Sequence, residues 1–148
     1  RLYRTEAADL EPKPQQPIPI WLGTFAPRSL ALTGRLADGW IPSLGYATAD
    51  DLPAMRDRVL AGAGAAGRDP EEITCALNIT VRVGETTEDP AIVAGRPEQI
   101  VEQLAGLAHI GFSTFNFMPD PAQANEQAML LAHDVLPALR AIVEQQAR

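Results

Sequence analysis

The connection Gly23-Thr24-Phe25-Ala26-Pro27-Arg28 is the part of this sequence best suited to binding a charged ligand. It follows a short apolar run that predicts a buried strand, and Pro27 suits the first position of a helix. Backbone N–H groups and the positive end of a helix dipole point into such a connection, and Gly23 lets a ligand approach the backbone closely. The connection is therefore a candidate phosphate site. The residues alone favour the alternative that the glycine serves only the turn, since the connection matches neither the dinucleotide nor the P-loop motif.

Other candidate residues lie on two predicted strands and near the end of a third. Polar side chains alternate with apolar ones and would line the lumen of a barrel: Asn78, Thr80, Thr114 and Asn116. Arg82 shares that face and either pairs with an anion or reaches solvent. Trp40 and Tyr46 either flank the ring of a bound ligand or pack.

No residue is assigned a catalytic role or a metal. His109 and His133 have no partner at metal-ligand or nucleophile spacing, and the alternation around Cys75 favours packing.

Four apolar runs predict strands, and each is followed by a run with helical spacing. The expected strands are 18–22, 39–43, 73–83 and 112–118, and the expected helices begin at Pro27, between residues 48 and 51, at Pro97 and at Ala122. Residues 84–95 are expected to form an exposed loop. Residues 1–17 are expected to form a proline-rich loop, and residues 18–148 to form one domain of four βα units.

Strands that alternate with helices predict an α/β fold with a parallel sheet and right-handed crossovers. Four such units can form an open parallel sheet or half of an (α/β)8 TIM barrel. The pattern alone leaves both alternatives open.

Composition excludes several classes of partner. The 148 residues include 12 Lys and Arg against 19 Asp and Glu, giving a net charge of −7, and the arginines are scattered. Neutralising phosphates needs a concentrated basic surface, so we expect no nucleic-acid partner and no membrane surface. No apolar run reaches the roughly 18 residues of a spanning helix, and no signal peptide is recognised. We expect a soluble, cytoplasmic protein.

Several motifs, in order along the chain, resemble the bacterial luciferase-like monooxygenase family. They are Ile20-Trp21-Leu22-Gly23, Pro27-Arg28, Gly34-Arg35-Leu36-Ala37-Asp38-Gly39-Trp40-Ile41-Pro42, Gly95-Arg96-Pro97-Glu98-Gln99-Ile100, Phe115-Asn116-Phe117-Met118-Pro119 and Val135-Leu136-Pro137. The resemblance runs from about residue 18 to residue 141. It identifies the chain as the carboxyl-terminal half of the family's barrel, since members carry eight strand-helix units.

The resemblance implies a coenzyme, either the deazaflavin F420 or FMN, bound at the carboxyl ends of the strands. The family's phosphate loop corresponds to Gly23, Thr24, Phe25 and Ala26, with Arg28 nearby. Many members of the deazaflavin branch have two glycines in this stretch. A bulky side chain at Gly23 is expected to obstruct the site without disturbing the core.

Two functions follow as hypotheses. The first is the carboxyl-terminal part of an oxidoreductase or monooxygenase that acts on a small-molecule substrate, transferring hydride or activating oxygen, and is inactive as this half alone. The second is a non-catalytic half-barrel that acts through self-association or partner binding.

Both hypotheses predict association, because half a barrel leaves two unpaired strand edges and apolar strand faces. We expect this chain to pair with the missing amino-terminal half or with a second copy. Sedimentation of the 148-residue chain at micromolar concentration should show a dimer or a higher oligomer. A compact, stable monomer would contradict the half-barrel and favour an open sheet that covers its own edges.

Overall fold

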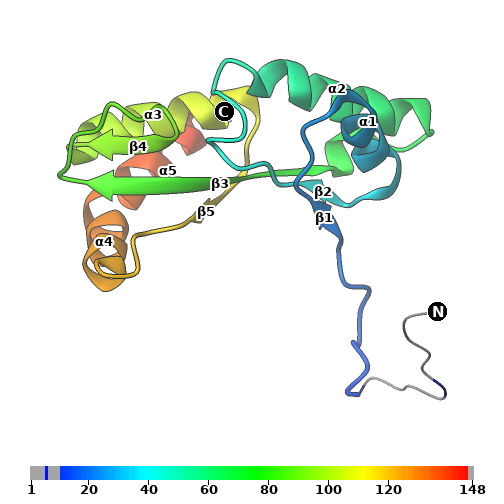
Figure 1. Cartoon of the computed structure of the whole chain (residues 1–148), viewed down its shortest axis with the longest axis horizontal. Helices are drawn as coiled ribbons and strands as arrows, with labels where there is room; N and C mark the ends of the chain where they lie inside the picture. Colours follow the sequence, from blue (N-terminus) through cyan, green and yellow to red (C-terminus); the bar gives the residue numbers. More distant parts are fainter. Residues whose placement is uncertain (1–5, 7–10, 147–148) are drawn as a thin grey trace.

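The computed structural model describes residue 6 and residues 11–146, which fold around a parallel sheet (Figure 1). Its strands are β1 (Trp21–Leu22), β2 (Gly39–Trp40), β3 (Thr74–Val83), β4 (Ile92–Gly95) and β5 (Thr114–Phe117). Its helices are α1 (Pro27–Leu36), α2 (Leu52–Ala65), α3 (Pro97–Ile110), α4 (Ala124–Leu130) and α5 (Leu136–Gln146), with short turns η1 (Pro70–Glu72) and η2 (Leu131–Val135). Residues 1–5 and 7–10 of the expected proline-rich loop lie outside the described residues, and residues 11–20 form neither helix nor strand.

β3 is the central strand, and three other strands pair with it in parallel. Successive backbone groups of a strand point to opposite edges, so hydrogen bonds reveal which edge each partner occupies. Asn78 exchanges bonds with the chain that follows β2, and the N–H just after β3, at Gly84, donates to Gly95 at the end of β4. The odd-numbered carbonyls of Cys75 and Ile79 accept from the β5 edge. β2 and β4 therefore share one edge of β3, and β5 occupies the other.

The two faces of β3 differ as the alternation in the sequence predicts. Its odd-numbered residues from 75 to 83 are buried in the core with side chains from the helices. On the opposite face, Thr74, Asn78, Thr80 and Arg82 are only half-buried. The helices α1, α2 and α3 all lie along one side of the strands (Figure 1). The polar face is therefore the open face of the sheet.

β4 corrects the expectation that residues 84–95 form a loop. Ile92–Gly95 pairs with the carboxyl end of β3, in the register Thr80 to Ile92 and Val83 to Gly95. The edge of β3 that β2 occupies is free beyond Asn78, and a four-residue apolar segment is long enough to satisfy it.

The carboxyl-terminal helix shows how the chain accommodates a proline. A proline inside a helix removes a backbone hydrogen bond, and here η2, the segment immediately before α5, is a π-helical turn. Leu136 donates to the carbonyl of Leu131, five residues back. Because a proline has no N–H to donate, the wider turn lets α4 and α5 continue as one helical segment.

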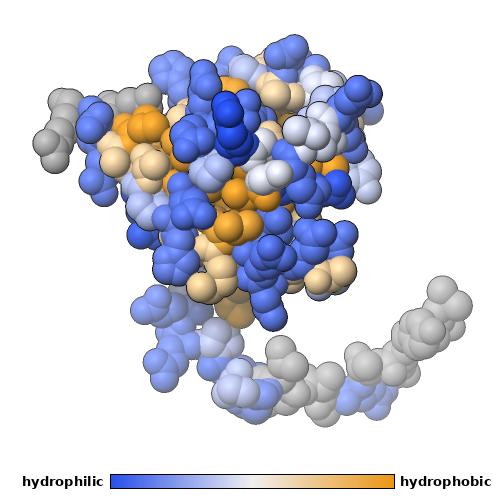
Figure 2. Space-filling model, turned by 90° about the vertical axis from the view of Figure 1, so that its left-hand side faces the viewer, coloured by the Kyte–Doolittle hydropathy of each residue, from blue (hydrophilic) through white to orange (hydrophobic). Residues whose placement is uncertain are grey.

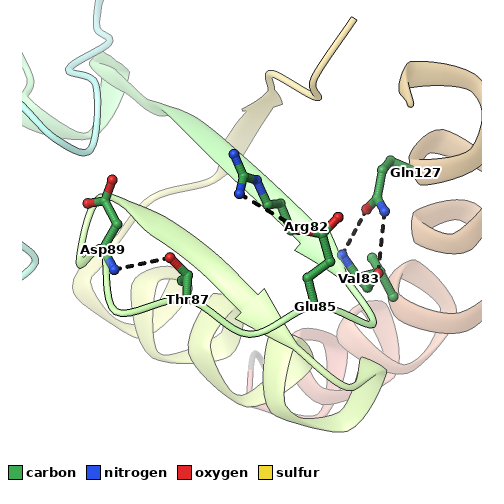
Figure 3. A network of polar contacts seen from close by, with 6 residues as sticks. All are labelled: Arg82, Val83, Glu85, Thr87, Asp89 and Gln127. Atoms are coloured by element: carbon green, nitrogen blue, oxygen red, sulfur yellow. Dashed lines mark hydrogen bonds and ion pairs between the residues drawn. The ribbon is translucent and has the colours of Figure 1, made fainter. Parts of the chain in front are cut away.

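Gln127 on α4 extends the sheet with its side chain. It is 4% exposed, and its amide accepts from the backbone N–H of Val83 at 2.8 Å and donates to the carbonyl of the same residue at 3.3 Å (Figure 3). These bonds satisfy backbone groups of β3 beyond the end of β5.

The surface formed by the ends of α3, β4 and α4 carries no large apolar patch in this view (Figure 2). Apolar side chains appear there in small groups within a largely hydrophilic surface (Figure 2). Among the described residues, no helix is long and apolar enough to cross a membrane.

Glycines allow α1 and α2 to pack at backbone contact. A Cβ added at Gly34 would lie 1.9 Å from the carbonyl oxygen of Val59, and one at Gly62 would lie 2.5 Å from that of Ala31. Arg68 follows α2 and donates to the carbonyls of Gly34 and Ala37, at 2.8 and 2.7 Å, which ties down the end of α1. The position of α1, and therefore of the loop before it, depends on this contact.

The substitution Gly34→Ala should lower the free energy of unfolding by about 2–3 kcal/mol, because the two helices must separate to admit the methyl group. Gly106→Ala is the matched control, since nothing lies within 4 Å of a Cβ at that helical position. The control should be neutral or gain up to about 1 kcal/mol from helix propensity. Urea denaturation of both variants measures the difference, and equal stabilities would show that the helices are not in contact here.

Candidate functional site

The loop between β1 and α1 is held from inside by buried side chains. Trp40 is fully buried, and its indole Nε1 donates to the carbonyl of Thr24 at 3.0 Å. The hydroxyl of Thr24 lies 2.8 Å from that of buried Thr33, which itself donates to the carbonyl of Ser29. The ring of Trp40 also packs against Phe112, with centroids 5.6 Å apart. Trp40 therefore packs in the core, the second of its two predicted roles, and it fixes the loop.

The amide groups of this loop are available to a ligand. Within residues 6 and 11–146, no hydrogen bond is made by the backbone N–H of Thr24, Phe25, Ala26, Arg28 or Ser29. No side chain caps the amino end of α1, and its first turn has no acidic residue. Donors and the positive end of the helix dipole are thus both unopposed, which suits an anion.

Packing against the neighbouring chain requires a glycine at position 23, which the sequence did not predict. A Cβ there would lie 2.9 Å from the carbonyl oxygen of Ile41, because the chain after β2 passes directly beside it. A bulky side chain at Gly23 would therefore displace the end of the sheet. The expectation that such a change leaves the core undisturbed is wrong, and other residues must test the loop.

A cavity of about 420 Å³ lies between α1 and α2, next to the β1–α1 loop. Phe25 and Tyr46 form one wall, with ring centroids 5.6 Å apart, and Tyr46 is 82% exposed. Arg58 and Asp51 supply the charges. Two hydrogen bonds from Thr48, one from its hydroxyl and one from its backbone N–H, lower the pKa of the Asp51 carboxyl.

Sequence reasoning did not identify Arg58 as part of a site. The cavity residues of α2 and the residue just before it follow helical spacing at positions 51, 54, 55 and 58, so a helical wheel would have placed them together. The sequence does not show that α1 packs at this face.

Two of the four polar residues predicted to line a lumen, Asn78 and Asn116, form a hydrogen-bonded row with Ser43 on the open face. The amide of Asn116 donates to Asn78 at 2.8 Å, and the amide of Asn78 donates to the hydroxyl of Ser43 at 3.1 Å. The row crosses from β5 over β3 to the chain after β2. Thr80 and Thr114 are half-buried, and Asn116 is exposed.

Arg82, Cys75 and the two histidines lie outside the β1–α1 loop and the cavity beside it. The guanidinium of Arg82 lies 3.7 Å from the carboxylate of Glu85, and both side chains are more than a third exposed (Figure 3). Burial raises the pKa of the Cys75 thiol, and the charge of Arg56 and a hydrogen bond from it act in the opposite direction. His109 and His133 are exposed on helices.

A second, larger cavity of about 670 Å³ lies apart from this loop, between the start of α2, the chain from residue 87 to 94, and α3. Most of its lining is apolar. It was not expected from the sequence, because part of its wall is the unpredicted strand β4.

Comparison with known proteins identifies the family. Residues 1–91 match the model of the luciferase-like monooxygenase family. The chain belongs to this family. The resemblance carried by its sequence motifs is thereby confirmed.

Individual members and structures agree with this membership. The chain is 28% identical, over 97% of its length, to an F420-dependent glucose-6-phosphate dehydrogenase of Nakamurella multipartita, and it covers 54% of that protein. It superposes with a TM-score of 0.73, at 17% identity, on an F420-dependent secondary alcohol dehydrogenase in complex with an F420-acetone adduct, covering 89% of this chain and 52% of the other. For riboflavin lyase with modified FMN, the TM-score is 0.66 at 14% identity, covering 82% of this chain and 42% of the other. The chain spans about half the length of these luciferase-like proteins.

The superpositions settle the choice between the two predicted architectures. The fold is α/β with a parallel sheet, and it corresponds to part of the barrel of luciferase-like enzymes. The lateral order β1, β2, β3, β5 follows the chain, as neighbouring strands of a barrel do. In a closed barrel of this kind, the open face with its asparagine row would be the side of the sheet toward the lumen.

The substitution Trp40→Phe tests how the loop is held. It preserves an aromatic ring in the core but leaves the Thr24 carbonyl without its donor, which should cost about 1–2 kcal/mol of unfolding free energy. Trp21→Phe is the control, since Trp21 is 37% exposed and its indole makes no hydrogen bond with the described residues. Urea denaturation of both variants should show a larger loss for Trp40→Phe, and an equal loss in the two would contradict the anchoring role.

Proposed function

We propose that this chain is the carboxyl-terminal half of a luciferase-like oxidoreductase and that its β1–α1 loop holds the phosphate of F420. The observation that carries the proposal is the set of unpaired N–H groups at Thr24, Phe25, Ala26, Arg28 and Ser29, at an uncapped helix end. The dependence of two similar proteins on F420 supports this coenzyme. FMN remains the alternative, because a protein that holds modified FMN has the same fold.

The residues of the loop fit a phosphate group. Oxygen atoms of a phosphate need several convergent donors, and the loop supplies backbone N–H groups that a Trp40 bond and a Thr33 hydroxyl keep in place. Arg28 adds a guanidinium at the second position of α1, where it is exposed. Many deazaflavin-binding members have glycines where Thr24 and either Phe25 or Ala26 stand here, so the ligand would approach a backbone that carries side chains.

When bound, such a coenzyme supplies the hydride chemistry, and the protein supplies binding and orientation. The asparagine row offers amide donors and acceptors on the lumen side, where they can orient a ring or a substrate. The substrate is a small molecule under this proposal.

The other half of the site would come from a partner. The open face and the outer edges of β1 and β5 need strands on both sides to close a barrel. The missing amino-terminal half is the occupant we propose, with a second copy of this chain as the alternative. A half-barrel that only associates, without a coenzyme, is the competing function, and the same open face favours it.

Coenzyme titration of the full-length protein separates these functions. F420 fluorescence should be quenched on binding, and Arg28→Gln should weaken binding by about tenfold, because a charge-assisted contact with the phosphate is lost. Arg35→Gln is the matched control, since Arg35 is also exposed on α1 but lies in its last turn. Circular dichroism checks that both variants fold.

Failure of the full-length protein to bind either F420 or FMN would contradict the oxidoreductase proposal and favour the association module. Binding with equal affinity in wild type and Arg28→Gln would remove Arg28 from the phosphate site.

A further inference from the structure

The cavity of about 670 Å³ beside β4 has no part in the proposed function. It lies between the start of α2, the connection from β3 to β4, and α3, and we call it the β4 cavity. Its volume is within the range of small-molecule sites. It shares no lining residue with the cavity next to the β1–α1 loop, so a ligand bound here would be separate from the coenzyme.

Most of the wall of the β4 cavity is aliphatic. Among the described residues that line it, none is aromatic, and the larger apolar side chains come from the segment before α2, from α2, from β4 and from α3: Leu44, Pro53, Ile92, Val93, Leu107 and Ile110. Gly106 leaves part of the α3 wall without a side chain, and nothing lies within 4 Å of a Cβ built there. An aliphatic chain can therefore pack along α3 at this point.

Every charged residue in the wall of the β4 cavity is acidic. Asp50 comes shortly before α2, and Glu88 and Asp89 lie in the connection from β3 to β4. Within residues 6 and 11–146, no Lys, Arg or His lines the cavity, and the carboxylates of Asp50 and Glu88 make neither an ion pair nor a hydrogen bond. No cation of the wall offsets these charges, so the cavity attracts a cation.

The uncharged polar side chains of the wall also favour a donor as the ligand. The Nε2 of Gln103 donates to the carbonyls of Ala94 and Gln99, at 3.3 and 3.1 Å, which uses both of its hydrogens and leaves Oε1 as an acceptor. The hydroxyl oxygen of Thr87 accepts from the backbone N–H of Asp89 at 3.0 Å (Figure 3). An ammonium group has three N–H donors and no acceptor, so it matches a wall of carboxylate and amide oxygens.

We propose that the β4 cavity binds an amphipathic organic cation, an aliphatic ammonium whose head group lies among the carboxylates of Asp50, Glu88 and Asp89. Its hydrocarbon chain packs on the aliphatic wall along α3, beside Gly106, where burial of the methylene groups contributes to affinity. Because the carboxylates belong to two separate connections, the bound cation also links the segment before α2 to the connection between β3 and β4.

Calorimetric titration of the full-length protein with n-octylammonium tests the proposal at about pH 7, where an alkyl amine is protonated. Two further probes separate charge from apolar contact. We expect n-octylammonium to bind at least about tenfold more tightly than n-octanoate, which has the opposite charge, and than methylammonium, which lacks the chain.

Two variants locate the site. Gly106→Leu should fill the α3 wall and weaken n-octylammonium binding by at least about tenfold, whereas Gly64→Leu is the matched control. Gly64 lies on α2 outside the cavity, and the nearest atom to a Cβ there is 3.9 Å away. The double variant Asp50→Asn with Glu88→Gln should weaken binding by about fivefold, because two attractive charges are lost. Asp57→Asn, an exposed carboxylate of α2 outside the cavity, should leave binding unchanged.

Urea denaturation checks that each variant is folded, and the contrary outcomes are distinct. Absence of n-octylammonium binding to the wild type, or equal binding of n-octanoate, would overturn the proposal. Unchanged affinity in Gly106→Leu would place the ligand elsewhere and overturn it as well. If Gly106→Leu instead converts a larger species to a smaller one in sedimentation without ligand, the occupant is a second copy of the chain and the proposal is wrong. None of these results depends on F420 or FMN binding.

Discussion

A parallel sheet must be covered on both faces, and in this chain the helices α1, α2 and α3 lie along one side only. The rest of the structure depends on this constraint. On the covered face the odd-numbered residues of β3 are buried in the core, and on the other face Asn78, Thr80 and Arg82 remain half-buried. One face of the sheet is therefore left open, and the chain spans about half the length of the relatives it matches.

The site follows from the covered face. Close packing of α1 on α2 through Gly34 and Gly62 fixes the helix, and Trp40 fixes the loop before it from within the core. As a result the N–H groups of the loop are held without partners, so a ligand would not have to order them. The interior thus determines the geometry of a surface loop, and this link connects the packing of the helices to the proposed binding of a coenzyme.

The sequence predicted those features whose cause is local. Alternation over ten residues predicted β3, and prolines at first helical positions located the starts of α1 and α3. The first two strands are shorter than expected, since Pro19 and Pro42 have no N–H to donate to a ladder.

Features that depend on distant parts of the chain could not be predicted in this way. β4 forms because β3 is longer than β2 and leaves an edge to fill. The bonds of Gln127 to Val83, the clash that excludes a side chain at Gly23, and the place of Arg58 beside the loop all arise from contacts between separate elements. The β1–α1 loop was predicted only in part. The order of strand and helix gives its position in the sequence, but its shape depends on contacts with Trp40 and Thr33, which the sequence does not show.

Amide hydrogen exchange in the full-length protein, with and without F420, tests the central claim most directly. If the β1–α1 loop holds the phosphate, the N–H groups of residues 24–29 become donors to the ligand, and peptides that span them should exchange markedly more slowly in the complex. Bound coenzyme with unchanged exchange across residues 24–29, and protection only elsewhere, would contradict the account.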